Sequence, residues 1–162
     1  MLDSKCDLYN YADDNTLSSH DKNLQAVKHS LQTAASIGIK WFEDNHMKVN
    51  TDKFQALVLS PGMSSYPDNF TFEIDGVKIK PEKSVKLLGV YIDNKLNFHD
   101  HVTYICKQAA KQVNVLKRFS KILTKKEKLL IFNAFLLYNF NYCPLVWHLC
   151  GKTDMMKMEK NQ

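Results

Sequence analysis

The sequence predicts an α+β protein, in which a helix packed on a small antiparallel sheet is followed by a helical subdomain. Three observations lead to this fold class. Stretches that read as short strands lie near residues 6–11, 54–60, 70–80 and 85–92, each bounded by turn residues. Apolar residues recur at helical spacing between the first two stretches, over residues 24–42. From His99 onward the spacing is helical almost throughout.

The first predicted strand, residues 6–11, leads into two adjacent aspartates, Asp13 and Asp14. Carboxylates placed side by side repel each other, and each raises the pKa of the other. A divalent cation removes that cost, and hard oxygen ligands of this kind suit Mg2+. The run Asp-Asn-Thr is also typical of a turn or a helix entry, so the dipeptide alone leaves both interpretations open.

The first predicted helix follows a capping-box pattern, Ser18-Ser19-His20-Asp21, and ends before the polar pair Asn45-His46. A turn then leads into the predicted strand 54–60, with Lys53 at its start. A lysine in this place is ordinarily a solvated strand-end residue. Beside a phosphate-transfer site it could also neutralise or protonate a leaving pyrophosphate.

Residues 61–69 have loop composition, and the pattern after them predicts a hairpin over 70–80 with Asp75-Gly76 as its turn. The next predicted strand, residues 85–92, contains Gly89. A glycine inside a strand pattern indicates a bulge or a close approach by another segment.

Two helices are predicted after His99. The second begins at another capping box, Thr124-Lys125-Lys126-Glu127, and is very apolar. Residues 107–128 hold eight basic side chains and one acidic side chain. Such a face suits nucleic-acid phosphates, and a solvated helix surface explains it equally well. The candidate nucleic-acid-binding residues are Lys107, Lys111, Lys117, Arg118, Lys121, Lys125 and Lys126.

Charge is unevenly distributed along the 162 residues of the chain. Residues 1–75 hold 11 acidic and 6 basic side chains, whereas residues 76–162 hold 6 acidic and 16 basic ones. This asymmetry hints at a polyanionic partner. No apolar run approaches the ~20 residues that span a bilayer, and the start of the chain is unlike a secretory signal. We therefore expect an intracellular protein, in cytoplasm or nucleus, without a membrane partner.

The four cysteines form no Cys-x-x-Cys pair, so neither a zinc ribbon nor a disulfide framework nor a disulfide-linked partner is indicated. Cys143, His148 and Cys150 lie close together in the sequence, but their spacing is poor for metal ligands. We expect these cysteines to be buried instead, as free cysteines commonly are.

The order of these motifs resembles the reverse transcriptases of non-LTR (LINE-type) retrotransposons. The resemblance rests on the YADD motif Tyr11-Ala12-Asp13-Asp14, on the run Met-Lys-Val-Asn-Thr-Asp-Lys at 47–53, and on Lys-Leu-Leu-Gly-Val-Tyr-Ile-Asp at 86–93. Each piece is short, but their order and spacing are specific, and together they span nearly the whole chain. The region of Tyr138, Tyr142 and Trp147 is similar to the thumb of the family.

The resemblance implies a role for each part of the chain. Residues 1–97 would be the C-terminal part of a palm, 98–150 a helical thumb and 151–162 a tail. Asp13 and Asp14 would be catalytic carboxylates that bind Mg2+, and Lys53 would accompany the leaving pyrophosphate. Leu88, Gly89 and Val90 fall where the family has its primer grip. The basic helices would hold the duplex of RNA template and DNA primer by its backbone phosphates.

In this family another metal-binding aspartate, the fingers and the dNTP pocket precede the YADD position, and only ten residues precede Tyr11 here. Asp3 and Asp7 are too near to replace that aspartate. We therefore expect a fragment of an RNA-directed DNA polymerase that is inactive alone, with Mg2+-dependent nucleotidyl transfer from dNTPs in the full-length parent. The alternatives are a non-catalytic nucleic-acid-binding module made of the basic helices, and an untranslated remnant of an element.

Overall fold

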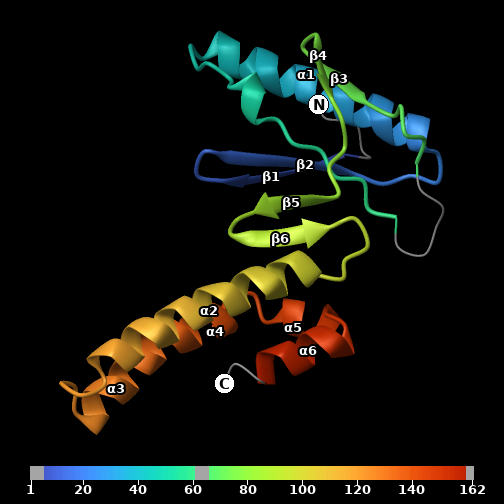
Figure 1. Cartoon of the computed structure of the whole chain (residues 1–162). Coiled ribbons are helices and arrows are strands. Elements are labelled where there is room, and N and C mark those ends of the chain that lie inside the picture. Colours follow the sequence, from blue (N-terminus) through green and yellow to red (C-terminus); the bar gives the residue numbers. More distant parts are fainter. Residues whose placement is uncertain (1–5, 61–65, 160–162) are drawn as a thin grey trace. The chain divides into compact units, whose positions relative to one another are not determined.

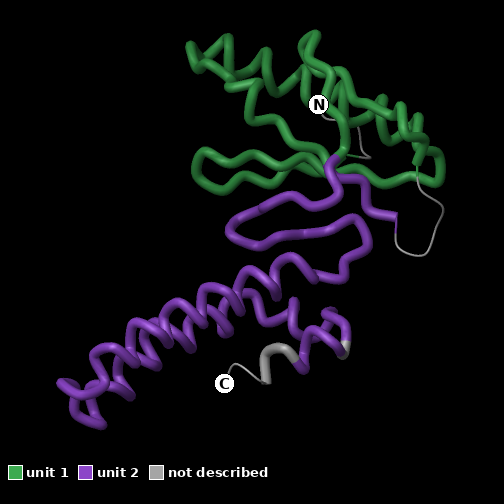
Figure 2. The backbone as a smooth tube through the Cα atoms, viewed as in Figure 1, with its two compact units in different colours: residues 1–56, 66–81 green, residues 57–65, 82–162 purple. Residues whose placement is uncertain are grey.

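A computed structural model of the chain describes residues 6–60 and 66–159. It combines helices with small antiparallel sheets, which confirms the α+β class (Figure 1). The chain divides into two compact units (Figure 2). The first unit comprises residues 1–56 and 66–81, and the second comprises residues 57–65 and 82–162. Part of the predicted loop 61–69, namely residues 61–65, and the residue Asp3 lie outside the described residues.

Two hairpins and one long helix form the first unit. Strands β1 (Cys6–Tyr11) and β2 (Asp14–Ser19) pair in an antiparallel register that runs from Cys6–Ser19 to Tyr11–Asp14. Strands β3 (Phe72–Ile74) and β4 (Val77–Ile79) pair around Asp75-Gly76, which confirms the predicted turn. Helix α1 (Leu24–Asp44) contacts both hairpins and buries its small residues Ser30, Ala34 and Ala35. The short 3-10 helix η1 (Thr51–Lys53) follows.

The predicted cap of the first helix is wrong. Ser18 and Ser19 belong to β2, where they pair with Asp7 and Cys6, so their backbone is extended. The cap is Asn23, whose side chain accepts a hydrogen bond of 2.9 Å from the amide of Gln25. Asparagine is as good a capping residue as serine, because its side-chain oxygen satisfies one of the open amides at the start of a helix.

The second unit contains a third hairpin and a set of helices. Its hairpin consists of β5 (Ser84–Leu87) and β6 (Val90–Asp93). The helices are α2 (His99–Phe119), α3 (Lys125–Ile131), the π-helix η2 (Phe132–Leu137), α4 (Tyr138–Asn141), α5 (Leu145–Leu149) and α6 (Lys152–Glu159). A buried core joins the hairpin to the helices through Val90, Phe98, Val102, Val146 and Cys150.

Two predicted strands differ from the structure. The stretch 85–92 forms two strands, because Leu88 and Gly89 have φ angles of +47° and +86° and make the turn between them. Residues 54–60 form no strand and make one isolated bridge, from Leu57 to Glu82. The single predicted sheet is therefore wrong, and the described residues hold three separate two-stranded sheets.

The C-terminal segment from residue 151, which we predicted as a tail, begins with helix α6. Asp154 in this helix is buried, and its carboxylate lies 3.0 Å from Nδ1 of His99 at the start of α2. The contact attaches α6 to the rest of the second unit. Across the described residues, every helix falls short of the length and apolar content needed to cross a bilayer.

Candidate functional site

The two aspartates of the YADD motif lie at the tip of the first hairpin. Asp13 shares the turn with Ala12, and Asp14 begins β2 opposite Tyr11. Both aspartates are exposed to solvent. The main-chain oxygen of Asp13 accepts a hydrogen bond of 3.3 Å from the side-chain amide of Asn15. The hairpin tip thus carries two carboxylates that are adjacent in the sequence and open to water, and such hard oxygen ligands are the kind that Mg2+ prefers.

Ala12 gives the turn an unusual backbone. Its φ angle is +53°, in the left-handed region that residues other than glycine rarely adopt. This conformation costs an alanine roughly 1 kcal/mol. Strained residues of this kind are often found at functional sites, where the geometry they enforce is used.

A third carboxylate does not join the pair within the described residues. Asp7 is four residues before Tyr11 on the same strand, which places it roughly 13 Å away along β1. In the part of the chain that the structure describes, no group of three His, Cys, Asp or Glu side chains is arranged to hold a metal ion. Any ion at Asp13 and Asp14 would therefore take its other ligands from water, nucleic acid or residues outside these ranges.

Lys53 lies at the end of η1, where its side chain is exposed. The turn is fixed by Asn50, whose side chain accepts a hydrogen bond of 3.2 Å from the amide of Asp52. Among the described residues, no hydrogen bond or ion pair links Lys53 to Asp13 or Asp14. The role of Lys53 beside the two aspartates therefore stays a prediction.

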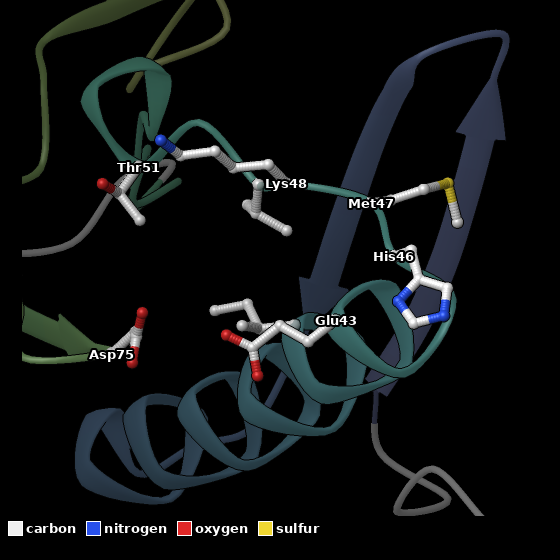
Figure 3. Close-up of a pocket in the computed structure, with 8 residues that line it drawn as sticks. Glu43, His46, Met47, Lys48, Thr51 and Asp75 are labelled. Atoms are coloured by element: carbon white, nitrogen blue, oxygen red, sulfur yellow. The ribbon is translucent and has the colours of Figure 1, made fainter.

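An open hollow beside η1 was not anticipated from the sequence. Glu43 near the end of α1 and Asp75 in the β3–β4 turn face it from one side, and Lys48 and Thr51 line it from another (Figure 3). The lining residues come from 39–51 and from Asp75, which is distant in the sequence, so a local pattern could not have revealed the whole hollow. It is wide and carries charges of both signs, which gives it no clear preference for one class of ligand.

The turn between β5 and β6 contains the residues that we associated with a primer grip. Leu88 is 41% exposed at the turn, whereas Val90 is buried in the core of the second unit. The hydroxyl of Tyr142 donates a hydrogen bond of 2.6 Å to the main-chain oxygen of Leu88. The ring of Tyr142 also packs at Gly89, where an added Cβ would lie 3.7 Å from it. Gly89 was predicted to mark a bulge or a close backbone approach by another segment or ligand within one strand, but it lies in the turn between two strands, where its contact with Tyr142 is an ordinary van der Waals contact.

The basic candidates all lie on the surface of the second unit. Lys107, Lys111 and Arg118 are spaced so that they follow one side of α2. The opposite side of this helix buries His101, Val102, Ile105 and Ala109. The remaining exposed basic candidates are Lys117 near the end of α2, Lys121 in the connection, and Lys125 and Lys126 in the first turn of α3.

The capping box at the start of α3 is confirmed. The Glu127 carboxylate accepts hydrogen bonds of 2.7 Å from both the hydroxyl and the amide of Thr124. Because these bonds favour the charged form, they lower the pKa of Glu127. The one acidic side chain among the basic residues is thereby engaged in the cap.

His101 was not predicted to be a core residue, yet it is 1% exposed. Its Nδ1 accepts a hydrogen bond of 3.4 Å from the amide of Tyr91, and its ring stacks on Trp147 at 6.2 Å between centroids. Burial lowers the pKa of His101, and the positive charge of Lys86 lowers it further. The residue is therefore a neutral part of the packing between β6 and α2.

Cys143, His148 and Cys150 are not arranged as a metal-binding group within the ranges that the structure describes. Cys150 is buried as predicted, with its thiol 3.5 Å from the main-chain oxygen of Trp147. Burial raises the pKa of the Cys150 thiol, and Asp154 raises it further. Cys143 packs against the same core and is half-buried, whereas His148 is exposed.

Comparison with known proteins shows a distant similarity to one class of enzyme. The chain is 28% identical over 119 residues to the RNA-directed DNA polymerase from mobile element jockey of Drosophila melanogaster. The similar region covers 74% of this chain and 12% of that protein, so the chain corresponds to a small part of its relative. No protein-family model and no solved structure matches the chain.

Proposed function

We propose that the chain is a segment of the reverse transcriptase of a non-LTR retrotransposon, with part of the palm in residues 1–97 and the thumb in 98–150. One observation carries this proposal: the YADD aspartates lie exposed at the tip of a strained hairpin, in a chain similar to the RNA-directed DNA polymerase of a mobile element. On this proposal the longer polymerase catalyses nucleotidyl transfer from dNTPs. This chain contributes to it two carboxylates and a surface that binds nucleic acid.

Asp13 and Asp14 would hold Mg2+. Two adjacent, exposed carboxylates provide hard oxygen ligands for this ion and leave positions open for phosphate oxygens. The bound ion would neutralise phosphate charge and favour deprotonation of the attacking hydroxyl. The hairpin positions both carboxylates, and Lys53 would offset the charge of the leaving pyrophosphate.

The basic face of α2 and α3 would hold the duplex of RNA template and DNA primer. Seven exposed lysine and arginine side chains are available there, and each phosphate contact displaces condensed counterions. Contacts of this kind fix a duplex without reading its sequence. The Leu88–Gly89 turn would meet the primer strand.

Binding of Mn2+, a paramagnetic substitute for Mg2+, tests the metal site. We expect low concentrations of Mn2+ to broaden the amide NMR signals of residues 11–16 selectively. The double variant Asp13→Asn, Asp14→Asn should abolish this broadening. The matched control is Glu43→Gln, Asp44→Asn, since these are also adjacent exposed acids. Equal broadening around both acidic pairs, or none at the hairpin tip, would contradict the assignment.

Primer extension tests whether Asp13 and Asp14 take part in DNA synthesis by the longer polymerase. The longest open reading frame that contains this chain should extend a DNA primer on an RNA template with Mg2+. Extension that survives the double asparagine change would exclude Asp13 and Asp14 from catalysis.

A non-catalytic nucleic-acid-binding module is the second candidate, and the exposed basic face favours it. Both candidates predict salt-sensitive duplex binding that weakens when Lys117, Arg118, Lys125 and Lys126 are changed to glutamine. The two candidates differ in what they predict for the hairpin tip, because only the first requires Asp13 and Asp14 to bind a metal ion. Duplex binding by a chain whose aspartates bind no Mn2+ would favour the second candidate.

A further inference from the structure

The hydroxyl of Tyr142 connects two segments that are 54 residues apart in the sequence. At 2.6 Å, its bond to the main-chain oxygen of Leu88 lies within the ordinary range for a hydroxyl donor. The Tyr142 side chain is partly exposed, so the packing of the second unit does not by itself require a tyrosine there. The contact fixes the tip of the β5–β6 hairpin.

The segment that carries Tyr142 is itself well anchored. On one side, the Asn139 side chain donates a hydrogen bond of 2.8 Å to Gln112, which attaches α4 to α2. On the other side, the indole of Trp147 donates a hydrogen bond of 2.6 Å to the main-chain oxygen of Phe140. Val146 of α5 is only 1% exposed and packs in the core of the second unit. The backbone that carries Tyr142 is therefore held in place on both sides.

The strands of the hairpin are attached to α2 independently of Tyr142. The ammonium group of Lys86 lies 5.5 Å from the ring centre of Tyr91 on the neighbouring strand and 5.3 Å from that of Tyr104 on α2. The amide of Tyr91 bonds to His101, also on α2. Loss of the Tyr142 hydroxyl would therefore release the turn while the strands stay in place.

We infer that Tyr142 is a positioning residue, which holds the Leu88–Gly89 turn where it meets the primer end of a template–primer duplex. This inference rests on the proposed function, because the role of the turn comes from it. On this inference the turn keeps a fixed position relative to the helices of the second unit, because Tyr142 attaches it to them. The turn and the basic face of α2 would then engage a duplex as one rigid body.

The variant Tyr142→Phe tests the inference, because phenylalanine keeps the ring that packs at Gly89 and removes only the hydroxyl. Tyr138→Phe is the matched control, since Tyr138 lies one turn earlier, is 64% exposed and loses the same atom. The probe is a template–primer duplex with a photoreactive nucleotide at the primer 3′ end. Crosslinks are mapped to the tryptic peptide that contains residues 87–95.

We expect the wild-type chain to crosslink at this peptide and Tyr142→Phe to lower the yield there about three- to tenfold, the range that one hydrogen bond accounts for. The Kd for the duplex should change less than about twofold, because phosphate contacts dominate the affinity. Amide hydrogen exchange at Gly89 and Val90 should accelerate in Tyr142→Phe. Tyr138→Phe should change none of these quantities.

Three outcomes would overturn the inference, and they differ in what they leave standing. Equal crosslinking in Tyr142→Phe and wild type would show that the hydroxyl does not position the turn. Duplex binding without any crosslink to residues 87–95 would remove the turn from the primer path and leave the basic face intact. Failure of the wild-type chain to bind the duplex would reject the proposed function itself.

Discussion

The two units hold their candidate residues in different ways. In the first unit Asp13, Asp14 and Lys53 are exposed, at a hairpin tip and a short helical turn. In the second unit the Leu88–Gly89 turn is fixed by Tyr142, and the adjacent Val90 is part of the core. Carboxylates that bind a hydrated ion must stay in water, because burial of an unpaired charge is costly. A surface that holds a duplex needs a fixed shape instead.

The packing of the two units differs less than the surroundings of these residues. The first unit buries Phe70, Phe72 and Ile79 together with small residues of α1. The second unit buries Phe98, Val102 and Val146 in a core that joins its hairpin to its helices. Truncation of a large core side chain should therefore destabilise the unit that holds it.

The largest expected effect is that of Phe98→Ala. Phe98 is 8% exposed and belongs to the core of the second unit. Its truncation should lower the free energy of unfolding of that unit by about 3–5 kcal/mol. The measurement is denaturant unfolding followed by the fluorescence of Trp147, in a Trp41→Phe background. Trp41 is 57% exposed, so this background change should be mild.

Phe119→Ala, at the other end of α2, is the control. Because Phe119 is 53% exposed, its truncation should cost less than about 1 kcal/mol. Similar losses for the two variants would mean that the second unit lacks the core described here.

A pH effect should distinguish the second unit from the first. Since the pKa of His101 is lowered in the folded state, the unfolded chain binds a proton more readily below about pH 6.5. The stability of the second unit should therefore be complete above that pH and decrease as the pH falls. His101→Gln should flatten this slope, measured by Trp147 fluorescence between pH 5 and 8. An unchanged slope would exclude His101 as its source.

A smaller effect is expected at the start of α3. Thr124→Ala removes the capping box and should cost about 1 kcal/mol of helix stability. The same change should raise the pKa of Glu127 part of the way toward its ordinary value, because it removes the hydrogen bond from the Thr124 hydroxyl, the larger cause of the lowered pKa, and keeps the one from the amide. Carboxyl NMR titration measures the pKa, and a value equal to that of the wild type would contradict the cap.

The smallest effect on stability is expected at the residues that we assign to catalysis. The double change Asp13→Asn, Asp14→Asn removes charge repulsion at an exposed hairpin tip, so the free energy of unfolding should change by less than about 0.5 kcal/mol. Chemical denaturation followed by Trp41 fluorescence measures it. A loss of several kcal/mol would assign these aspartates a structural role.

Local patterns predicted the two long helices, the start of a third and one turn. The apolar spacing identified α1 and α2, the Thr124 capping box identified the start of α3, and Asp75-Gly76 identified the β3–β4 turn. Strand β2 escaped prediction because its sequence, Asp-Asn-Thr-Leu-Ser-Ser, is mostly polar and reads as a turn and helix entry. Its extended backbone comes from pairing with β1, which composition does not record.

Contacts between residues that are distant in the sequence could not be predicted from local patterns. The β5–β6 turn was hidden because Leu88 adopts a positive φ angle that a leucine rarely takes, so the apolar run looked like one strand. Gly89 was the only residue in this run that indicated a departure from a regular strand, and it could not identify Tyr142 as the residue that contacts it. The motif placed Asp13 and Asp14 side by side in the sequence, whereas the distance of Lys53 from them depends on the fold.

The π-helix η2 lies in the helical segment that leads to Tyr142. A π-helix fits more residues into each turn than an α-helix, so one additional residue can be taken up while the later side chains keep their direction about the helix axis. In an unbroken α-helix, one additional residue would instead rotate every later side chain by about 100°. Tyr142 would then face away from Leu88. The wider winding of η2 thus preserves the angular phase of this helical segment, and with it the contact with the turn.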